Sequence, residues 1–343
     1  MSDVTSRCAR VVLCLSAFVT IGRFSLTGTA LAGSAATVLT NCGTISSQGN
    51  YVLGRNITVS GTCFTITSGN VGLDLGGHTI TGNGTGQGIR DLGANSANYT
   101  VIANGTITNF GQAIDLSNSS NVTIGSVNVS FNSGSGITIG GCCNTLTNIK
   151  ANNGSGVAIG GCCNTLSTIQ ADNNGSYGIY VQGGSNFGTG IEVDANGTGI
   201  FMGAGFNSLT STTANNNLLD GIQLNDGHSS VANSTASGNA ANGVRFSYSG
   251  ATGVIPGNNL VTNTTASGNG NDGIGETGAA ISIEYGDEVT NSTANRNHGH
   301  GIFLVCPSNA LGNSAAYNSG GNWSRLHRVE SAPTPATMHR ETA

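Results

Sequence analysis

A short phrase that recurs about every 22 residues constrains the fold of this chain more than any other feature. Gly-Ile or Gly-Val pairs form the phrase, and their apolar members lie at Ile137, Val157, Ile179, Ile200, Ile222 and Val244. The successive spacings are 20, 22, 21, 22 and 22 residues. Ile274 and Ile302 follow after 30 and 28 residues, which indicates an insertion in two of the repeats. A period of this length, built from short β-type segments between Gly and Asn, is typical of one turn of a solenoid.

The pattern inside each repeat predicts a strand. The residue two positions after the anchor is apolar as well, as in the pair Ile222 and Leu224. Because side chains alternate along a strand, these residues should face inward and the residue between them outward. An asparagine also recurs, where a turn that tolerates left-handed backbone would stack its side chains into a ladder. Its positions are Asn174, Asn217, Asn239, Asn269 and Asn297. The sequence therefore predicts an all-β parallel solenoid of about ten turns.

The composition excludes several other classes of protein. Charged residues make up 8% of the 343 residues, and 11 basic residues stand against 16 acidic ones. So few cations offer no electrostatic footprint for nucleic acid or for an anionic membrane. The 55 glycines, with many Asn, Ser and Thr residues, disfavour long helices.

The two ends of the chain differ from the repeats. Arg7 and Arg10 precede the apolar run 11–21, and small residues follow up to Ala32, which is the order of a secretory signal peptide. We therefore expect a secreted or periplasmic product without a membrane anchor. The expected division is a signal peptide at 1–32, an N-terminal cap at 33–70, a β-helix at 71–323 and a disordered tail at 324–343.

The segment VGLDLGGHTITGNG, residues 71–84, and the Asn-Gly-Ile repeats give the chain a specific resemblance. Over residues 40–320 it resembles secreted bacterial proteins of the right-handed parallel β-helix repeat family, in the pectin-lyase-like superfamily. The resemblance, together with the crossover rule for parallel strands, implies a right-handed coil. This superfamily includes polysaccharide lyases, hydrolases, epimerases, adhesins and accessory proteins, so the fold leaves the activity open.

Cysteines occur at positions that one turn of a solenoid would bring together. Cys42 and Cys63 lie 21 residues apart, and in an oxidising compartment we expect a disulfide between them. The pairs 142–143 and 162–163 occupy near-identical phrases one turn apart. Stacked cysteines at the spacing of adjacent strands would form inter-turn disulfides or remain buried thiols. A four-thiolate metal site is the alternative.

Candidate catalytic residues come from the position before each Gly-Ile or Gly-Val pair. Asp220, Asp272 and His300 share this position. The two carboxylates would lie two turns apart, about 9.6 Å in backbone spacing. That is near the upper end of the carboxylate separation of inverting glycosidases. Because Asp before Gly is also an ordinary turn residue, a structural role is the alternative.

Candidate substrate-binding residues come from the outward position after each anchor. Tyr180 and Phe201 are aromatic and would stack on sugar rings. Gln223 follows them, and Arg245 would bind the carboxylate of an acidic sugar as a planar fork. These residues predict a polysaccharide groove along residues 177–303.

The reaction is not determined by these residues. The paired aspartates of polygalacturonases are absent, as is the D-P-H-D phrase of mannuronan epimerases, and Lys150 has no acidic cluster around it. No cofactor is expected, although Glu284, Asp287 and Glu288 would suit Ca²⁺. The sequence favours a protein that binds or modifies polysaccharide, as a lyase or glycoside hydrolase if it is an enzyme. The alternatives are a non-catalytic structural or surface-interaction protein and, less favoured, an ice-binding or copper-delivery protein.

Overall fold

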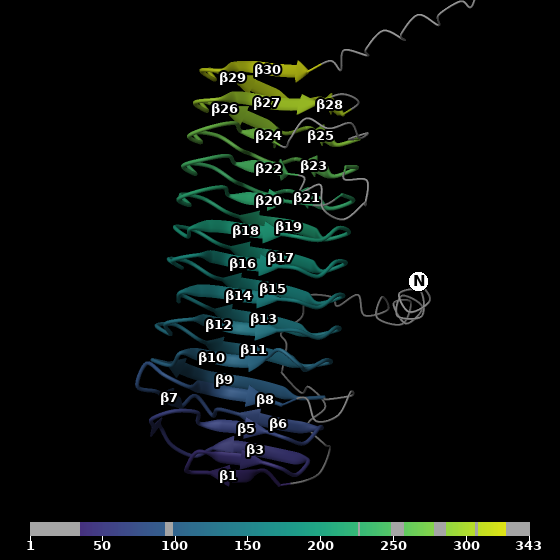
Figure 1. Ribbon diagram of the computed structural model, residues 1–343. Helices are drawn as coiled ribbons and strands as arrows, with labels where there is room; N and C mark the ends of the chain where they lie inside the picture. Colours follow the sequence, from purple (N-terminus) through teal and green to yellow (C-terminus); the bar gives the residue numbers. More distant parts are fainter. Residues whose placement is uncertain are drawn as a thin grey trace, which may run out of the picture.

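The protein is a solenoid whose coils of β-strands stack along one axis, as the computed structural model in Figure 1 shows. The structure describes residues 35–92, 99–225, 227–247, 257–277, 286–305 and 308–326. The expected signal peptide, Cys306 and residues 327–343 of the expected tail lie outside these residues. All strand pairs in the described ranges are parallel, and no helix occurs in them.

Two long sheets run the length of the stack. Sheet A has 15 strands, of which the main path is β1 (Thr37–Leu39), β3 (Gly49–Leu53), β6 (Val71–Asp74), β9 (Val101–Thr108), β11 (Thr123–Asn128), β13 (Thr145–Lys150), β15 (Thr165–Gln170), β17 (Phe187–Glu192), β19 (Ser208–Thr213), β21 (Ser230–Ala232), β23 (Leu260–Thr262), β25 (Glu288–Thr290) and β28 (Asn309–Leu311). Off this path lie β4 (Ile57–Thr58), which pairs with β7, and β7 (Thr79–Thr81), which also pairs with β9.

Sheet B has 13 strands. They are β2 (Gly43–Ile45), β5 (Phe64–Ile66), β8 (Gln87–Asp91), β10 (Gln112–Leu116), β12 (Ser135–Ile139), β14 (Ser155–Ile159), β16 (Tyr177–Val181), β18 (Thr198–Met202), β20 (Ile222–Leu224), β22 (Val244–Ser247), β24 (Ile274–Thr277), β27 (His300–Val305) and β30 (Gly321–Leu326). A separate pair joins β26 (Thr293–Asn295) to β29 (Ser314–Ala316).

The apolar anchors of the sequence repeat form the core between the sheets. Ile200, Ile222 and Val244 pair in register on β18, β20 and β22, and each is fully buried. Leu224, two positions after its anchor, is buried too, whereas Gln223 between them is half-buried on the outside. The predicted alternation is therefore confirmed.

The solenoid has about twelve turns rather than the expected ten. The expected cap region contributes β1 to β5, and these strands pair in register with the turns that follow. The additional turns lack the Gly-Ile phrase, so the repeat did not reveal them. The predicted disulfide between Cys42 and Cys63 is present here and joins the first two strands of sheet B at their start.

An asparagine ladder runs along the stack, as predicted, in the bends that lead from the strands of sheet A to those of sheet B. Asn132, Asn153, Asn196 and Asn318 extend the expected set at both ends and between its members. At most steps one side-chain oxygen accepts two bonds, as Asn239 Oδ1 does from the backbone N–H and Nδ2 of Asn217, at 3.0 and 2.9 Å. At the steps from Asn153 to Asn174 and from Asn196 to Asn217 it accepts the backbone N–H alone. The left-handed conformation belongs to the preceding residue, for example Asn216 with φ 55°. Every turn thus satisfies buried backbone groups of its neighbour.

A second ladder, not predicted, lies in the bends that lead from the strands of sheet B to those of sheet A. Its members are Asn144, Asn164, Asn186, Asn207, Ser229, Asn259, Asp287 and Ser308. Asp287 is fully buried, and its Oδ1 accepts the backbone N–H of Asn259 at 2.8 Å. No helix of sufficient length and apolar character to cross a membrane occurs in the described residues.

Candidate functional site

One column of outward side chains on sheet B contains the substrate-binding residues predicted from the sequence. Parallel pairing places these side chains on successive turns: Asp115, Thr138, Ala158, Tyr180, Phe201, Gln223, Arg245, Gly275 and Phe303. The long connections after β22 and β24 do not shift this register. The four predicted binding residues are therefore neighbours in one row.

Three aromatic rings form a cluster near the middle of this row. The rings of Tyr180 and Phe201 stack with centroids 5.1 Å apart and an interplanar angle of 19°. Tyr177, which lies three positions before Tyr180 on the same strand, contacts both rings at 4.9 and 5.7 Å. All three are half-buried, so each presents part of its ring to solvent. Gln182 donates a hydrogen bond from Nε2 to Tyr180 Oη at 2.8 Å and fixes the tilt of that ring.

Two turns after Phe201, Arg245 of the row forms an ion pair with Asp220, which lies in the neighbouring column. Arg245 Nη1 lies 3.1 Å from Asp220 Oδ2, with the guanidinium side chain 34% exposed and the aspartate side chain 4% exposed. The other carboxylate oxygen accepts the backbone N–H and Nδ2 of Asn242, one turn later, at 3.0 and 2.8 Å. Both oxygens of Asp220 are thus engaged within the protein. This carboxylate orients Arg245 and closes the turn beneath it.

Asp272 and His300 form a second pair farther along. Asp272 Oδ1 accepts the backbone N–H of His300 at 2.6 Å and lies 3.3 Å from its Nδ1. A carboxylate against Nδ1 favours the tautomer that carries the proton on that nitrogen. The His300 side chain is 31% exposed, and its ring packs at 5.2 Å against that of Phe303.

Gly275 interrupts the row of outward side chains between Arg245 and Phe303, because Asp272 packs where its side chain would lie. A Cβ atom at this position would lie 2.8 Å from Asp272 Oδ2 and 3.0 Å from Asp272 Cβ. The absence of a side chain at Gly275 therefore lets Asp272 pack against the backbone of β24. Sequence reasoning overlooked this position because a glycine carries no chemical group to recognise.

The expected catalytic residues share one column, beside the outward row. Asp220, Asn242, Asp272 and His300 occupy equivalent positions on four successive turns and are linked by side-chain to backbone hydrogen bonds. Asp220 and Asp272 are two turns apart, and each is at least nine-tenths buried. Sequence reasoning did not foresee that Asp220 pairs with Arg245. It also missed Tyr177, whose contact with Phe201 becomes evident only when the turns are stacked.

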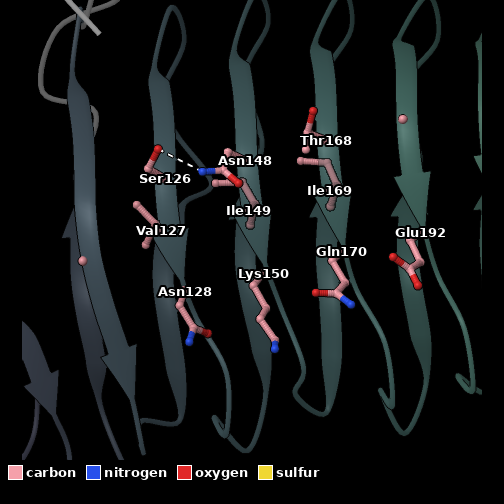
Figure 2. Close-up of a pocket in the computed structure, with 12 residues that line it drawn as sticks. Ser126, Val127, Asn128, Asn148, Ile149, Lys150, Thr168, Ile169, Gln170 and Glu192 are labelled. Atoms are coloured by element: carbon pink, nitrogen blue, oxygen red, sulfur yellow. Dashed lines mark hydrogen bonds between the residues drawn. The ribbon is translucent and has the colours of Figure 1, made fainter. Parts of the chain in front are cut away.

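A separate hollow of about 470 Å³ lies on sheet A, where its strands bend (Figure 2). Left-handed residues in consecutive strands, such as Ser126, Asn148 and Thr168, produce the bend. The side chains of Lys150 and Glu192 flank the hollow, and none of its lining residues is aromatic. It offers polar contacts without a stacking surface.

Glu192, which lines this hollow, interacts electrostatically with two further carboxylates. Burial raises the pKa of the Glu192 carboxyl above its ordinary value, and the charges of Asp172 and Asp194 raise it further. Burial also raises the pKa of Asp194, against the lowering effect of a hydrogen bond from the Asn215 backbone. These carboxyls repel one another and have no cation in hydrogen-bond contact among the contacts described.

The described residues contain no group of three or more His, Cys, Asp or Glu side chains that could hold a metal ion. Of the acidic patch considered for Ca²⁺, Asp287 belongs to the second ladder, Glu288 is exposed and Glu284 lies outside the described residues. The Cys-Cys pairs at 142–143 and 162–163 are described, are not disulfide-bonded, and lie on the turns after β12 and β14.

Comparisons with known proteins agree with this architecture. A family described as "Right handed beta helix region" matches residues 112–255. The A-module of the Azotobacter vinelandii mannuronan C-5 epimerase AlgE4 has a TM-score of 0.52 at 14% identity, over 84% of this chain and 89% of that one. The AlgE6 A-module of the same organism gives 0.48 at 18% identity over 82% and 90%, and pectate lyase Pel9A gives 0.37 at 17% over 92% and 76%. No curated protein matches the sequence. At these identities the likeness concerns the fold alone.

Proposed function

This chain is a right-handed parallel β-helix repeat protein, and we propose that the outward face of sheet B binds a polysaccharide that carries acidic sugars. The observation that supports this most is the stacked pair of Tyr180 and Phe201 on adjacent turns, both partly open to solvent. The proposed place of action is outside the cytoplasm, in keeping with the leader-like sequence at residues 1–32.

Exposed aromatic rings in a fixed array suit carbohydrate. The apolar faces of sugar rings stack on aromatic rings, and a rigid platform loses little conformational freedom when it binds. Successive turns lie about 4.8 Å apart, so the row from Tyr180 to Phe303 is about 24 Å long. A linear glycan lying along the axis would contact one outward side chain per turn.

Arg245 supplies the proposed preference for an acidic glycan. Its guanidinium is held by Asp220 and remains 34% exposed on the row that carries the aromatic rings. A planar guanidinium recognises a carboxylate through parallel N–H donors. The AlgE4 A-module, which shares the fold, is a mannuronan C-5 epimerase, so this architecture does support action on a polysaccharide.

Modification of the bound glycan is a second candidate, favoured by one observation. Asp272 fixes the imidazole of His300 through Nδ1. An imidazole oriented in this way would exchange a proton with the substrate through its other nitrogen. In this proposal Asp272 positions His300, and Asp220 positions Arg245.

Binding is tested by titration calorimetry with a panel of neutral and uronate-containing polysaccharides. Phe201→Ala should weaken binding of the best ligand about 3- to 10-fold, from the loss of one stacking contact. Arg245→Ala should weaken only the uronate-containing ligands. The matched control is Thr210→Ala, an outward residue of sheet A, which should bind as the wild type does. If no polysaccharide binds the wild type, the non-catalytic structural alternative gains support.

Turnover is tested on any polysaccharide that binds. Changes in mass, in unsaturation and in the sugar isomers of the product would distinguish hydrolysis, lyase activity and epimerisation. His300→Gln should lower a turnover rate by about 10²-fold or more. We propose no role for Ca²⁺, so a chelator should leave both affinity and turnover unchanged.

A further inference from the structure

Four cysteine thiols meet on two adjacent turns, away from the proposed glycan face. They follow β12 and β14 in the phrases Gly-Gly-Cys-Cys-Asn, and all four are half-buried. The backbones of the two turns are hydrogen-bonded at this point, because Cys143 N–H donates to the carbonyl oxygen of Cys162 at 3.2 Å. Cys162 N–H in turn lies 3.4 Å from the sulfur of Cys142.

Cys162 lies between two other sulfur atoms. Burial raises the pKa of its thiol well above the ordinary range, and hydrogen bonds with the Cys142 and Cys163 side chains add to the effect. Two disulfides are therefore conceivable, one across the turns and one between sequence neighbours. Consecutive Cα atoms are about 3.8 Å apart. Disulfides span Cα distances of about 4.4–6.8 Å, a range that excludes sequence neighbours and includes the spacing of adjacent turns, about 4.8 Å.

The protein contains such a bridge elsewhere. Cys42 and Cys63 immediately precede Gly43 and Phe64, which pair in register on β2 and β5. Their disulfide spans a Cα–Cα distance of 4.6 Å over 21 residues. Cys142 and Cys162 are related in the same way, by one turn of 20 residues.

We propose that Cys142 and Cys162 are an oxidation site that forms a second inter-turn disulfide when it meets a low-molecular-weight disulfide. The Cys142 thiolate attacks the oxidant R–S–S–R, forms a mixed disulfide and releases one thiol, RSH after protonation. Cys162 then loses its proton and displaces the second RSH from Cys142. Two protein thiols are oxidised, one disulfide is reduced to two thiols, and no further reactant is needed. Cys143 and Cys163 remain thiols.

The bond would tie together the segments that follow β12 and β14. Closing a loop of this length restricts the unfolded chain. We expect the oxidised protein to melt about 5 °C or more above the reduced protein. The existing bridge at Cys42 would be intact in both samples, provided that the reductant is mild and the linkage is verified.

The chain allows a direct test, because Lys150 is the only lysine and no arginine lies between it and the second pair. The full chain is incubated with glutathione disulfide, alkylated and digested with trypsin, which separates residues 91–150 from 151–245. We expect these two peptides to be joined by a reducible bond. Cys142→Ser should abolish the linkage, whereas the matched double variant Cys143→Ser/Cys163→Ser should retain it, with both variants folded by circular dichroism.

Four outcomes would overturn the proposal. They are a bond within residues 151–245 between Cys162 and Cys163, a linkage that depends on Cys143 and Cys163, four thiols that stay alkylatable after oxidation, and stoichiometric zinc or copper that blocks oxidation. Glycan binding is not part of the readout, so the result stands whether or not the proposed function holds.

Discussion

The outer faces of sheets A and B share one lattice of parallel strands but carry different side chains. On sheet A, small hydroxyl residues recur on successive turns, and Thr290 Oγ1 donates to Thr262 Oγ1 at 3.1 Å. On sheet B, the equivalent outward positions change from Tyr180 to Phe201 and then to Arg245. The fold requires apolar side chains only in the core between the sheets, so the outward side chains of either sheet can vary without disrupting it. Sheet B differs in that its aromatic rings stack on adjacent turns, whereas Phe187 and Leu260 on sheet A stand singly among hydroxyl residues.

The largest effect should come from breaking the core that both faces share. Ile222→Asp would bury an unpaired carboxylate in the apolar stack, at a cost of several kcal/mol. We expect soluble protein to be lost from expression trials. The adjacent outward substitution Gln223→Ser should yield normal amounts of folded protein. Normal yield of the Ile222 variant would contradict the inward assignment of this residue.

The next effect concerns a ladder that supports both faces. Asn239→Ala removes the oxygen that accepts the backbone N–H of Asn217 and leaves that buried donor unpaired. We expect a loss of about 2 kcal/mol, seen as a lower melting temperature. Thr210→Ala on the outside of sheet A should change stability by less than about 0.5 kcal/mol. Equal losses in both variants would mean that ladder and surface contribute alike.

A smaller effect should separate the faces directly. Gly275→Ala would place a methyl group 2.8 Å from Asp272 Oδ2 and displace the carboxylate that orients His300 on sheet B. We expect glycan affinity to fall about 5-fold, or about 1 kcal/mol, in the titrations proposed above. Ala232→Val adds volume at an outward position of sheet A and should leave affinity unaltered. Unchanged affinity in the Gly275 variant would place the ligand elsewhere on the row.

The smallest effect concerns the charges of sheet A. The pKa of Asp194 is raised in the folded protein, so its native state binds protons more tightly than its unfolded state. Its contribution to stability is therefore present below its ordinary pKa of 3.8 and is lost as the pH rises through the raised value. Asp194→Asn should be more stable than wild type at pH 7 by a few tenths of a kcal/mol, because solvent screens the charge. Melting curves at pH 3 should coincide, and a stabilisation confined to pH 3 would reverse the assignment.

Much of the fold could be predicted because the same core packing and hydrogen bonds recur in a solenoid at a fixed period. Ile222 and Leu224 are apolar at a spacing of two, and this alone gives strand, facing and core. The second ladder could not be read in this way, since Asn259, Asp287 and Ser308 are different residue types that share one hydrogen-bonding task. A search for one recurring residue type does not find a column whose members share only their position in the coil.

The candidate site was predictable as a set of positions but not as a set of contacts. The outward row around Phe201 follows from parity. The ion pair joins Asp220 to Arg245 on the next turn and in the neighbouring column. It therefore depends on side-chain length and on where the chain bends. Side-chain pairing at such a distance in sequence, 25 residues here, carries no local signal.

The constancy of the register across unequal connections has a consequence for the length of the molecule. Ile222, Val244 and Ile274 pair in order although they lie 22 and then 30 positions apart in the sequence. Each turn meets the same partners above and below, so a turn added or deleted as a whole would find a matching neighbour on either side. The length of the protein can therefore change by whole turns. Its span, and with it the number of ligand units that fit along it, would grow in whole steps without redesign of what is already there.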